Sequence, residues 1–185
     1  MLMSAENNEK ILYDTSAVDR ALTRIAHEII ERNDEDSELC IFGIRRRGVP
    51  LAEQIAKTIA GFSDIKVNVG ELDITLYRDD LSEIGDKPAV TSAKADFDIK
   101  NKTVILVDDV IYTGRTARAA MEALLSLGRP SRIQLAVLID RGHRELPIRG
   151  DYVGKNVPTS RDEIICVKLP EYDGCKMVTI KNESK

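Results

Sequence analysis

The sequence is poor in cysteine, aromatic residues and long apolar runs. Its three cysteines, Cys40, Cys166 and Cys175, are an odd number without a close pair, so neither a disulfide framework nor a zinc site is expected. No apolar run approaches the ~20 residues that cross a bilayer. The opening residues, MLMSAENNEK, also lack the basic and apolar regions of a signal peptide. We therefore expect a cytoplasmic protein with reduced thiols and no membrane partner.

The chain also lacks a strong excess of either charge. Of its residues 31% are charged and 43% are hydrophobic, and the formal net charge is −4. This composition is typical of a globular protein and argues against a generally basic coat for nucleic acid. Any RNA binding must therefore come from a local patch. A chain of 185 residues is most simply one domain, residues 1–185.

Alternating strand and helix patterns run along most of the chain. Apolar residues at helical spacing predict an amphipathic helix over residues 17–32, with Arg20, Arg24, His27 and Glu31 on its polar face. Short apolar runs alternate with further helices, which predicts an α/β fold with a doubly wound, mainly parallel sheet. The predicted strands span residues 39–44, 65–69, 71–77, 104–107 and 133–139, with Gly70 separating the second from the third.

A polar segment near residues 78–98 is longer than most loops within a compact domain. It contains Gly85 and Pro88 and follows a predicted strand. Segments of this length are commonly lids or binding loops. We expect a flexible lid, in the form of a hairpin, over a site at the end of that strand; we call this segment the hood.

The most specific motif is VILVDDVIYTGRT, residues 104–116. Asp108 and Asp109 follow a buried strand, at the edge where open α/β sheets bind their ligands. Gly114 allows a turn before a helix, whose first amides attract phosphate. The carboxylates can accept hydrogen bonds from ribose hydroxyls, and the hydroxyls of Thr113 and Thr116 can help to hold a 5′-phosphate. An ordinary strand, an Asp turn and a capped helix are the alternative, against which the length of the motif argues.

A second motif is GIRRRG, residues 43–48, which places three consecutive arginines at a strand-to-helix turn. Guanidinium groups and exposed amides at such a turn can hold a diphosphate. Taken alone, this segment is equally compatible with a solvated basic loop.

Both motifs resemble those of type I phosphoribosyltransferases. The resemblance implies that Asp108 and Asp109 bind ribose hydroxyls, that residues 113–116 bind the 5′-phosphate, and that Arg47 and Gly48 bind pyrophosphate. Arg78, at the start of the hood, is a further candidate pyrophosphate ligand. The resemblance implies ribosyl transfer from 5-phosphoribosyl 1-diphosphate, with Mg²⁺ bound mainly through the diphosphate and water and no metal site made by the protein alone. The catalytic residues expected are Asp108, Asp109, Arg47 and Arg78.

The second half resembles the bacterial pyrimidine operon attenuation proteins. The segments that carry this resemblance are 128–131, 134–147 and 151–160, and the similarity extends from residue 20 to about 169. The resemblance implies that uracil and 5-phosphoribosyl 1-diphosphate give UMP and diphosphate, that the protein binds pyrimidine operon leader mRNA, and that it forms a homodimer or higher homo-oligomer. The implied nucleotide-binding residues are Arg46, Arg47, Gly48, Asp108, Asp109, Val110, Ile111, Tyr112, Thr113, Gly114, Arg115, Thr116, Arg141 and Ile165. The implied RNA-binding residues are Thr23, Arg24, His27, His143, Arg149 and Lys155.

Two alternatives remain open. A pyrimidine-salvage phosphoribosyltransferase would turn over without RNA regulation, and a regulator that has lost catalysis would keep the site only to bind UMP. One departure from the second family is Arg46, which stands where a small hydroxyl residue is common. The basic residues between 141 and 161 alone predict RNA binding only weakly, because charged segments are usually solvated.

Overall fold

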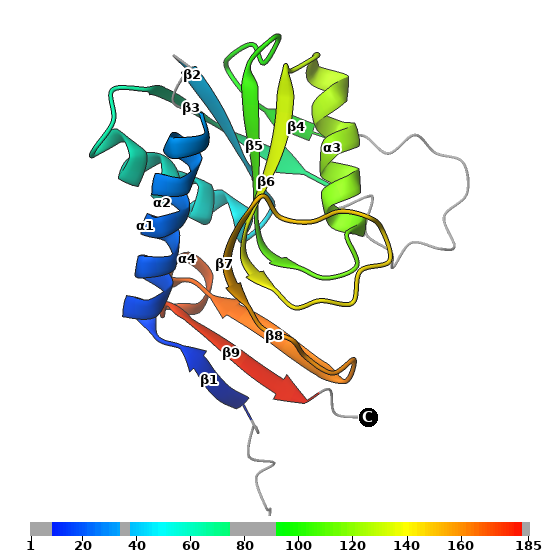
Figure 1. Ribbon diagram of the computed structural model, residues 1–185. Helices are drawn as coiled ribbons and strands as arrows, with labels where there is room; N and C mark the ends of the chain where they lie inside the picture. Colours follow the sequence, from blue (N-terminus) through cyan, green and yellow to red (C-terminus); the bar gives the residue numbers. More distant parts are fainter. Residues whose placement is uncertain (1–8, 34–37, 75–91, 183–185) are drawn as a thin grey trace, which may run out of the picture.

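The computed structural model describes residues 9–33, 38–74 and 92–182 (Figure 1). Arg78 and the part of the predicted hood up to residue 91 lie outside the described residues. The elements are β1 (Glu9–Tyr13), α1 (Thr15–Arg32), β2 (Glu38–Ile44), α2 (Gly48–Ala60), β3 (Lys66–Asp73), β4 (Ser92–Lys94), β5 (Thr103–Ile111), α3 (Arg115–Leu127), β6 (Arg132–Asp140), β7 (Tyr152–Asn156), β8 (Glu163–Lys168), α4 (Pro170–Asp173) and β9 (Met177–Asn182).

A six-stranded sheet in the order β4-β3-β2-β5-β6-β7 forms the centre of the fold. Its strands are parallel except for β4, which pairs antiparallel with β3. Helices α1 and α2 cover one face and α3 covers the other (Figure 1). Successive side chains of β2 point to opposite faces of this sheet, so the strand contributes to two hydrophobic cores. Leu39 and Ile41 pack with α1 and α2, whereas Cys40 and Phe42 pack with α3. The predicted doubly wound α/β fold is confirmed.

Helix α1 agrees with its predicted amphipathic pattern. Val18, Leu22, Ile25 and Ile29 are all buried. The helix begins two residues before the predicted start, at Thr15 rather than residue 17. The side chain of Asp14 accepts a hydrogen bond from the Ala17 amide at 2.8 Å, and this N-cap satisfies an amide of the first turn.

The predicted break at Gly70 is wrong, because β3 is one continuous strand over residues 66–73. Gly70 pairs with Phe42 of β2. A Cβ added at Gly70 would lie 2.5 Å from Cε1 of that ring. The glycine therefore makes room for a neighbouring core ring instead of ending the strand. Residues 75–77 of the predicted second strand lie outside the described residues.

Strand β5 continues beyond its predicted end at Val107 to Ile111. It pairs with β2 only as far as Val107, but its pairing with β6 runs on to Ile111. Asp108 and Asp109 therefore lie within the strand and not after it, in a stretch that projects past β2. The projecting stretch gives the two carboxylates a rigid support.

A second sheet, of three antiparallel strands in the order β1-β9-β8, was not predicted. It lies below the central sheet in the view of Figure 1, and the short helix α4 connects β8 toward β9. The three cysteines are free; Cys40 is buried, whereas Cys166 on β8 is half-buried. No helix in the described part of the chain is long and apolar enough to cross a membrane.

Candidate functional site

A cavity of about 370 Å³ lies at the projecting end of β5. It brings the predicted residues 108–114 and Thr116 together with Arg141 from the end of β6 and Ile165 from β8. Ala117, Leu135 and Val137 also line it. These three read as ordinary core positions in the sequence, so no local signal marked them. Residues separated by more than fifty positions thus meet in one hollow of a size suited to a small ligand.

The two carboxylates on the cavity wall are oriented by their own backbone. Asp108 Oδ1 accepts a hydrogen bond from the Asp109 amide at 2.9 Å. Asp109 Oδ1 accepts one from the Val110 amide at 2.8 Å. Both residues are half-buried. The acidic pair is therefore held in a defined direction and contributes acceptors to the cavity.

The turn that follows β5 is supported from outside the cavity. Gly114 has a φ of +95°, a conformation that glycine adopts readily. The Thr113 carbonyl accepts hydrogen bonds from the amides of Glu145 at 2.9 Å and Leu146 at 3.1 Å. Arg115 forms an ion pair with Glu145 at 2.8 Å and does not line the cavity. The turn and the first residues of α3 line the cavity, and the exposed amides at the start of a helix can hold a phosphate.

Arg141 connects the cavity wall to the segment before β8. Only 8% of this residue is exposed. Its guanidinium donates to Thr159 Oγ1 at 3.1 Å, to the Ser160 carbonyl at 3.2 Å and to the Glu163 carbonyl at 2.7 Å. Arg141, which was predicted to belong to the nucleotide site, lines the cavity. Its contacts also show that it positions the segment that leads to Ile165.

The loop Arg45 to Gly48, which we call the pyrophosphate loop after its predicted ligand, passes close to the residue before the acidic pair. A Cβ added at Gly48 would lie 2.3 Å from the Val107 carbonyl oxygen, so only glycine allows this approach. The Arg45–Arg46 peptide bond is cis. Arg46 and Arg47 do not line the cavity described above. Arg47 Nη2 instead donates to Asp173 Oδ1 at 3.1 Å and Oδ2 at 3.2 Å.

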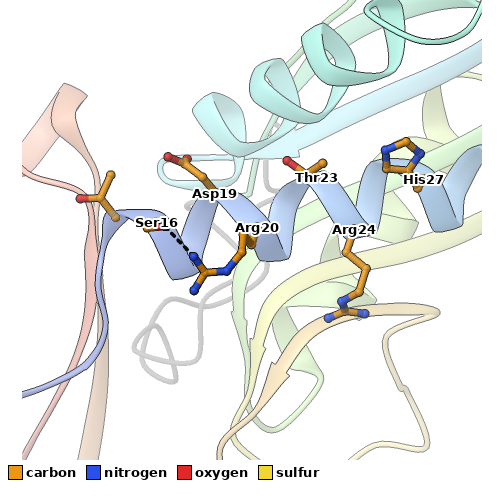
Figure 2. A pocket seen from close by; sticks show the side chains of 7 residues that line it. Ser16, Asp19, Arg20, Thr23, Arg24 and His27 are labelled. Atoms are coloured by element: carbon orange, nitrogen blue, oxygen red, sulfur yellow. Dashed lines mark hydrogen bonds between the residues drawn. The ribbon is translucent and has the colours of Figure 1, made fainter.

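Three of the predicted RNA-binding residues, Thr23, Arg24 and His27, lie along one exposed stretch of α1. They line an open hollow together with residues of the first turns of that helix (Figure 2). In Figure 2 Thr23 and His27 point to one side of α1, and Arg24 points to the other. The ring of His27 stacks on Phe62, with 4.0 Å between centroids. The side of α1 that carries Thr23 and His27 is therefore accessible and partly aromatic.

Lys155 lies near the side of α1 to which Arg24 points, because Arg24 reaches across to β7. Arg24 Nη2 donates to the Val153 carbonyl at 3.0 Å and to the Gly154 carbonyl at 2.6 Å. Lys155 follows directly and is exposed, with its Nζ 5.6 Å from the centroid of the Tyr13 ring. Arg24 and Lys155 thus belong to one surface.

His143 and Arg149 are placed differently. His143 Nε2 lies 2.6 Å from the Thr159 carbonyl oxygen, and its ring centroid is 5.8 Å from that of Tyr112, a cavity residue. Arg149 is exposed and lines a separate hollow of about 320 Å³. The structure therefore places His143 closer to this cavity than to α1.

Comparison with known proteins gives the same family as the fold and the cavity. The family model for the phosphoribosyl transferase domain matches residues 8–173. A relative from Clostridium novyi named bifunctional protein PyrR is 59% identical over 172 residues, covering 93% of this chain and 97% of the relative. A protein of the same name from Acetivibrio thermocellus is 60% identical over 174 residues, covering 94% and 95% of the two chains.

Solved structures support the fold. A hypoxanthine phosphoribosyl transferase from Trypanosoma cruzi superposes with a TM-score of 0.76 at 17% identity, covering 98% of this chain and 95% of that one. A hypoxanthine-guanine phosphoribosyltransferase from Bacillus anthracis gives 0.68 at 16% identity, covering 96% and 99%. The chain belongs to the phosphoribosyltransferase family and, within it, to the proteins named bifunctional protein PyrR.

Proposed function

We propose that this protein transfers the phosphoribosyl group of 5-phosphoribosyl 1-diphosphate to uracil, giving UMP and diphosphate, and that it also binds pyrimidine operon leader mRNA as a transcription attenuation regulator. The observation that carries the proposal is the cavity in which the acidic pair, the phosphate turn, Arg141 and Ile165 meet. Relatives near 60% identity that carry the name bifunctional support both halves. Cytoplasmic location remains a prediction from the sequence.

The cavity suggests how the sugar is held. The 5′-phosphate would bind at residues 113–116, where the turn precedes a helix. The ribose hydroxyls would donate to Asp108 and Asp109, whose carboxylates are already fixed by backbone amides. Uracil would lie toward Ile165, with backbone groups there reading its polar edge. This arrangement holds the base next to the anomeric carbon of the sugar. The translational and rotational entropy of the two reactants is then lost when they bind, and the chemical step itself has a lower barrier.

The transfer forms a bond between uracil N1 and the anomeric carbon while the bond from that carbon to diphosphate breaks. The electron pair of the broken bond leaves with the diphosphate, and the N1 proton is lost. Positive charge develops on the sugar, which the neighbouring carboxylates stabilise because the site is partly removed from water. A covalent nucleophile on the protein is not needed.

We propose that Mg²⁺ accompanies the diphosphate. Among the described residues no group of three or more His, Cys, Asp and Glu side chains is arranged to hold a metal ion. In the described part of the chain, Asp108 and Asp109 are the acidic residues that line the cavity. Such a pair fits Mg²⁺, which usually keeps several waters and takes its remaining ligands from substrate phosphates and one or two carboxylates. When bound, the ion would neutralise part of the charge of the leaving group. Arg47 would supply a further positive charge.

RNA binding is proposed for Lys155 and the exposed surface of α1 that carries Thr23, Arg24 and His27, which we call the α1 face. Arg149 and His143 lie further away. A homodimer or higher homo-oligomer remains part of the proposal. Such an assembly would place two or more α1 faces on one particle, so a single RNA could contact more than one of them.

The direct test of the enzyme is UMP and diphosphate formation from 5-phosphoribosyl 1-diphosphate with Mg²⁺, using uracil, hypoxanthine or no base. We expect product with uracil only, and a strong loss of turnover in the Asp109→Asn variant. Product with hypoxanthine at a comparable kcat/KM would contradict the proposed specificity. No turnover with either base would remove the enzymatic half of the proposal.

A further inference from the structure

The pyrophosphate loop is held from outside by α4. Arg47 Nη2 contacts both carboxylate oxygens of Asp173, at 3.1 and 3.2 Å. The Tyr172 hydroxyl donates to the Arg46 carbonyl at 3.1 Å. The guanidinium carbon of Arg46 also lies 5.1 Å from the centroid of the Tyr172 ring. Tyr172 and Asp173 of α4 thus bind two consecutive residues of the loop, Arg46 and Arg47.

The Asp173 carboxylate, which binds Arg47, is itself held in place by the backbone. Asp173 Oδ2 accepts a hydrogen bond from the Leu169 amide at 2.9 Å, and the Asp173 amide donates to the Leu169 carbonyl at 2.7 Å. The Leu169 amide, and then Arg47, hold the pKa of Asp173 below its ordinary value. The group is therefore ionised at neutral pH, and its side chain is only 24% exposed. Asp173 is a rigid anionic anchor and not a freely rotating surface acid.

Arg47 keeps an unused donor while it is held in this way. Among the residues that the structure describes, its Nε is buried and has no hydrogen-bond partner. A buried donor without a partner is costly and therefore unusual in a folded protein. The loop that carries Arg47 meets β5 at Val107, directly before the acidic pair. The unsatisfied donor thus belongs to the side chain that family resemblance assigns to pyrophosphate.

From this geometry we infer that Asp173 is a positioning residue, which holds Arg47 in place to receive the diphosphate of the substrate. This inference rests on the proposed function. A free arginine loses considerable side-chain entropy when it binds a ligand, whereas one already fixed by a carboxylate has lost much of it beforehand. The same segment carries Ile165 in β8 just before α4. Asp173 therefore ties the pyrophosphate loop to the chain segment that forms the base side of the cavity.

The test is a double-mutant cycle in the full chain with Arg47→Ala, Asp173→Ala and the double variant. We expect Asp173→Ala to lower kcat/KM for 5-phosphoribosyl 1-diphosphate about tenfold, as expected for a misplaced catalytic contact. The double variant should be no slower than Arg47→Ala alone, because Asp173 acts only through Arg47. Affinity for UMP should stay unchanged, since UMP carries no diphosphate. The control is Glu122→Ala, which removes the partner of Arg118 on the exposed side of α3.

A second readout does not require turnover. Calorimetric binding of inorganic pyrophosphate with Mg²⁺ should weaken about tenfold in Asp173→Ala and not in Glu122→Ala. If the wild type binds pyrophosphate in this way but fails to use uracil, the proposed function fails while this inference stands. Unchanged pyrophosphate affinity in Asp173→Ala would overturn the inference. Tighter binding would also overturn it, because the carboxylate would then compete with the ligand. A further loss from Asp173→Ala in the Arg47→Ala background would overturn it as well, by showing a role independent of Arg47.

Discussion

The guanidinium carbon of Arg141 lies 4.0 Å from the centroid of the Tyr112 ring. Tyr112 belongs to the wall that also carries the acidic pair. Arg141 directly follows the neighbouring strand β6 and donates hydrogen bonds to residues 159, 160 and 163. The contact therefore joins the sugar side of the cavity to the segment that leads to the base side. His143, one of the residues proposed for RNA binding, also contacts this segment, with its Nε2 2.6 Å from the Thr159 carbonyl oxygen.

We expect Arg141→Lys to weaken UMP binding about tenfold or more and to lower the melting temperature. Lysine keeps the charge, but it lacks the planar group that reaches three acceptors and lies over a ring. Each lost hydrogen bond from a charged donor contributes about 1.5–3 kcal/mol. Calorimetry with UMP and a thermal melt measure the two effects. Arg118→Lys, an exposed change on α3, is the control, and equal affinities for UMP in both variants would remove Arg141 from the site.

The substitutions Asp108→Asn and Asp109→Asn should each reduce use of 5-phosphoribosyl 1-diphosphate about tenfold to over a hundredfold. The estimate corresponds to about 1.5–3 kcal/mol for a lost hydrogen bond to a charged acceptor. The domain should remain folded, because both side chains lie on the cavity wall and not in either core. Steady-state kinetics with circular dichroism tests this. Full activity in both variants would mean that the acidic pair does not touch the substrate.

Much of the fold was predictable because local patterns agree with it. The buried strands, the polar face of α1 and the phosphate turn after β5 each have a signature within a few residues. Gly70 was misread because the reason for a glycine there is the ring of Phe42, nearly thirty positions away. A strand-breaking glycine and a glycine that makes room for a neighbour look identical in sequence.

The second sheet and the anchor on Arg47 were not predictable for a related reason. Strand β1 pairs with β9 from the opposite end of the chain, Lys10 opposite Ile180, and no local pattern announces such a pairing. Asp173 lies in no recognised motif, and only the fold brings it to Arg47. Arg141 and Ile165 were assigned to the site by family resemblance. That resemblance did not predict the carbonyl partners of Arg141 or the position of His143 beside Tyr112.

Stability toward acid should depend on Glu38, at the start of β2. Hydrogen bonds from Lys102, Asn68 and Lys66 lower the pKa of this carboxyl to about 2, from 4.5. Because the folded pKa lies below the unfolded one, the contribution of Glu38 to stability is complete above about pH 4.5 and is lost as the pH falls toward 2. Glu38→Gln should thus lower the free energy of unfolding at pH 7 and show a smaller further loss on acidification. Urea titrations at pH 7 and pH 3 measure this effect. The control is Glu53→Gln, at an exposed position of α2. If the stability of Glu38→Gln depends on pH in the same way as that of the wild type, the prediction is wrong.

The RNA surface makes a prediction that depends on salt. Lys155→Ala and Arg149→Ala should weaken RNA binding, while the rate of phosphoribosyl transfer to uracil remains near normal. If each side chain contacts one phosphate, its loss should reduce the slope of log affinity against log salt by about 0.7 to 0.9. Arg24→Ala should weaken RNA binding too, but it also removes bonds to β7 and so should lower stability. Lys100→Ala, an exposed lysine before β5, should change neither property. Loss of catalysis with intact RNA affinity would reverse the assignment.

The central claim is that one domain binds both UMP and leader RNA and that each affects the other. Thermodynamic linkage requires UMP to change RNA affinity by the same factor by which RNA changes UMP affinity, and couplings are typically about 1–3 kcal/mol. The route suggested by the structure runs from the cavity through Arg141 and Thr159 toward β7 and Lys155.

The most direct measurement is a titration of a labelled hairpin from the organism's own pyrimidine leader transcript, at fixed salt, without UMP and with saturating UMP. We predict that UMP tightens RNA binding roughly five- to 150-fold, and that Lys155→Ala weakens RNA binding both with and without UMP. If the two curves coincide while calorimetry shows that UMP is bound, the switch does not exist and the chain is a salvage phosphoribosyltransferase.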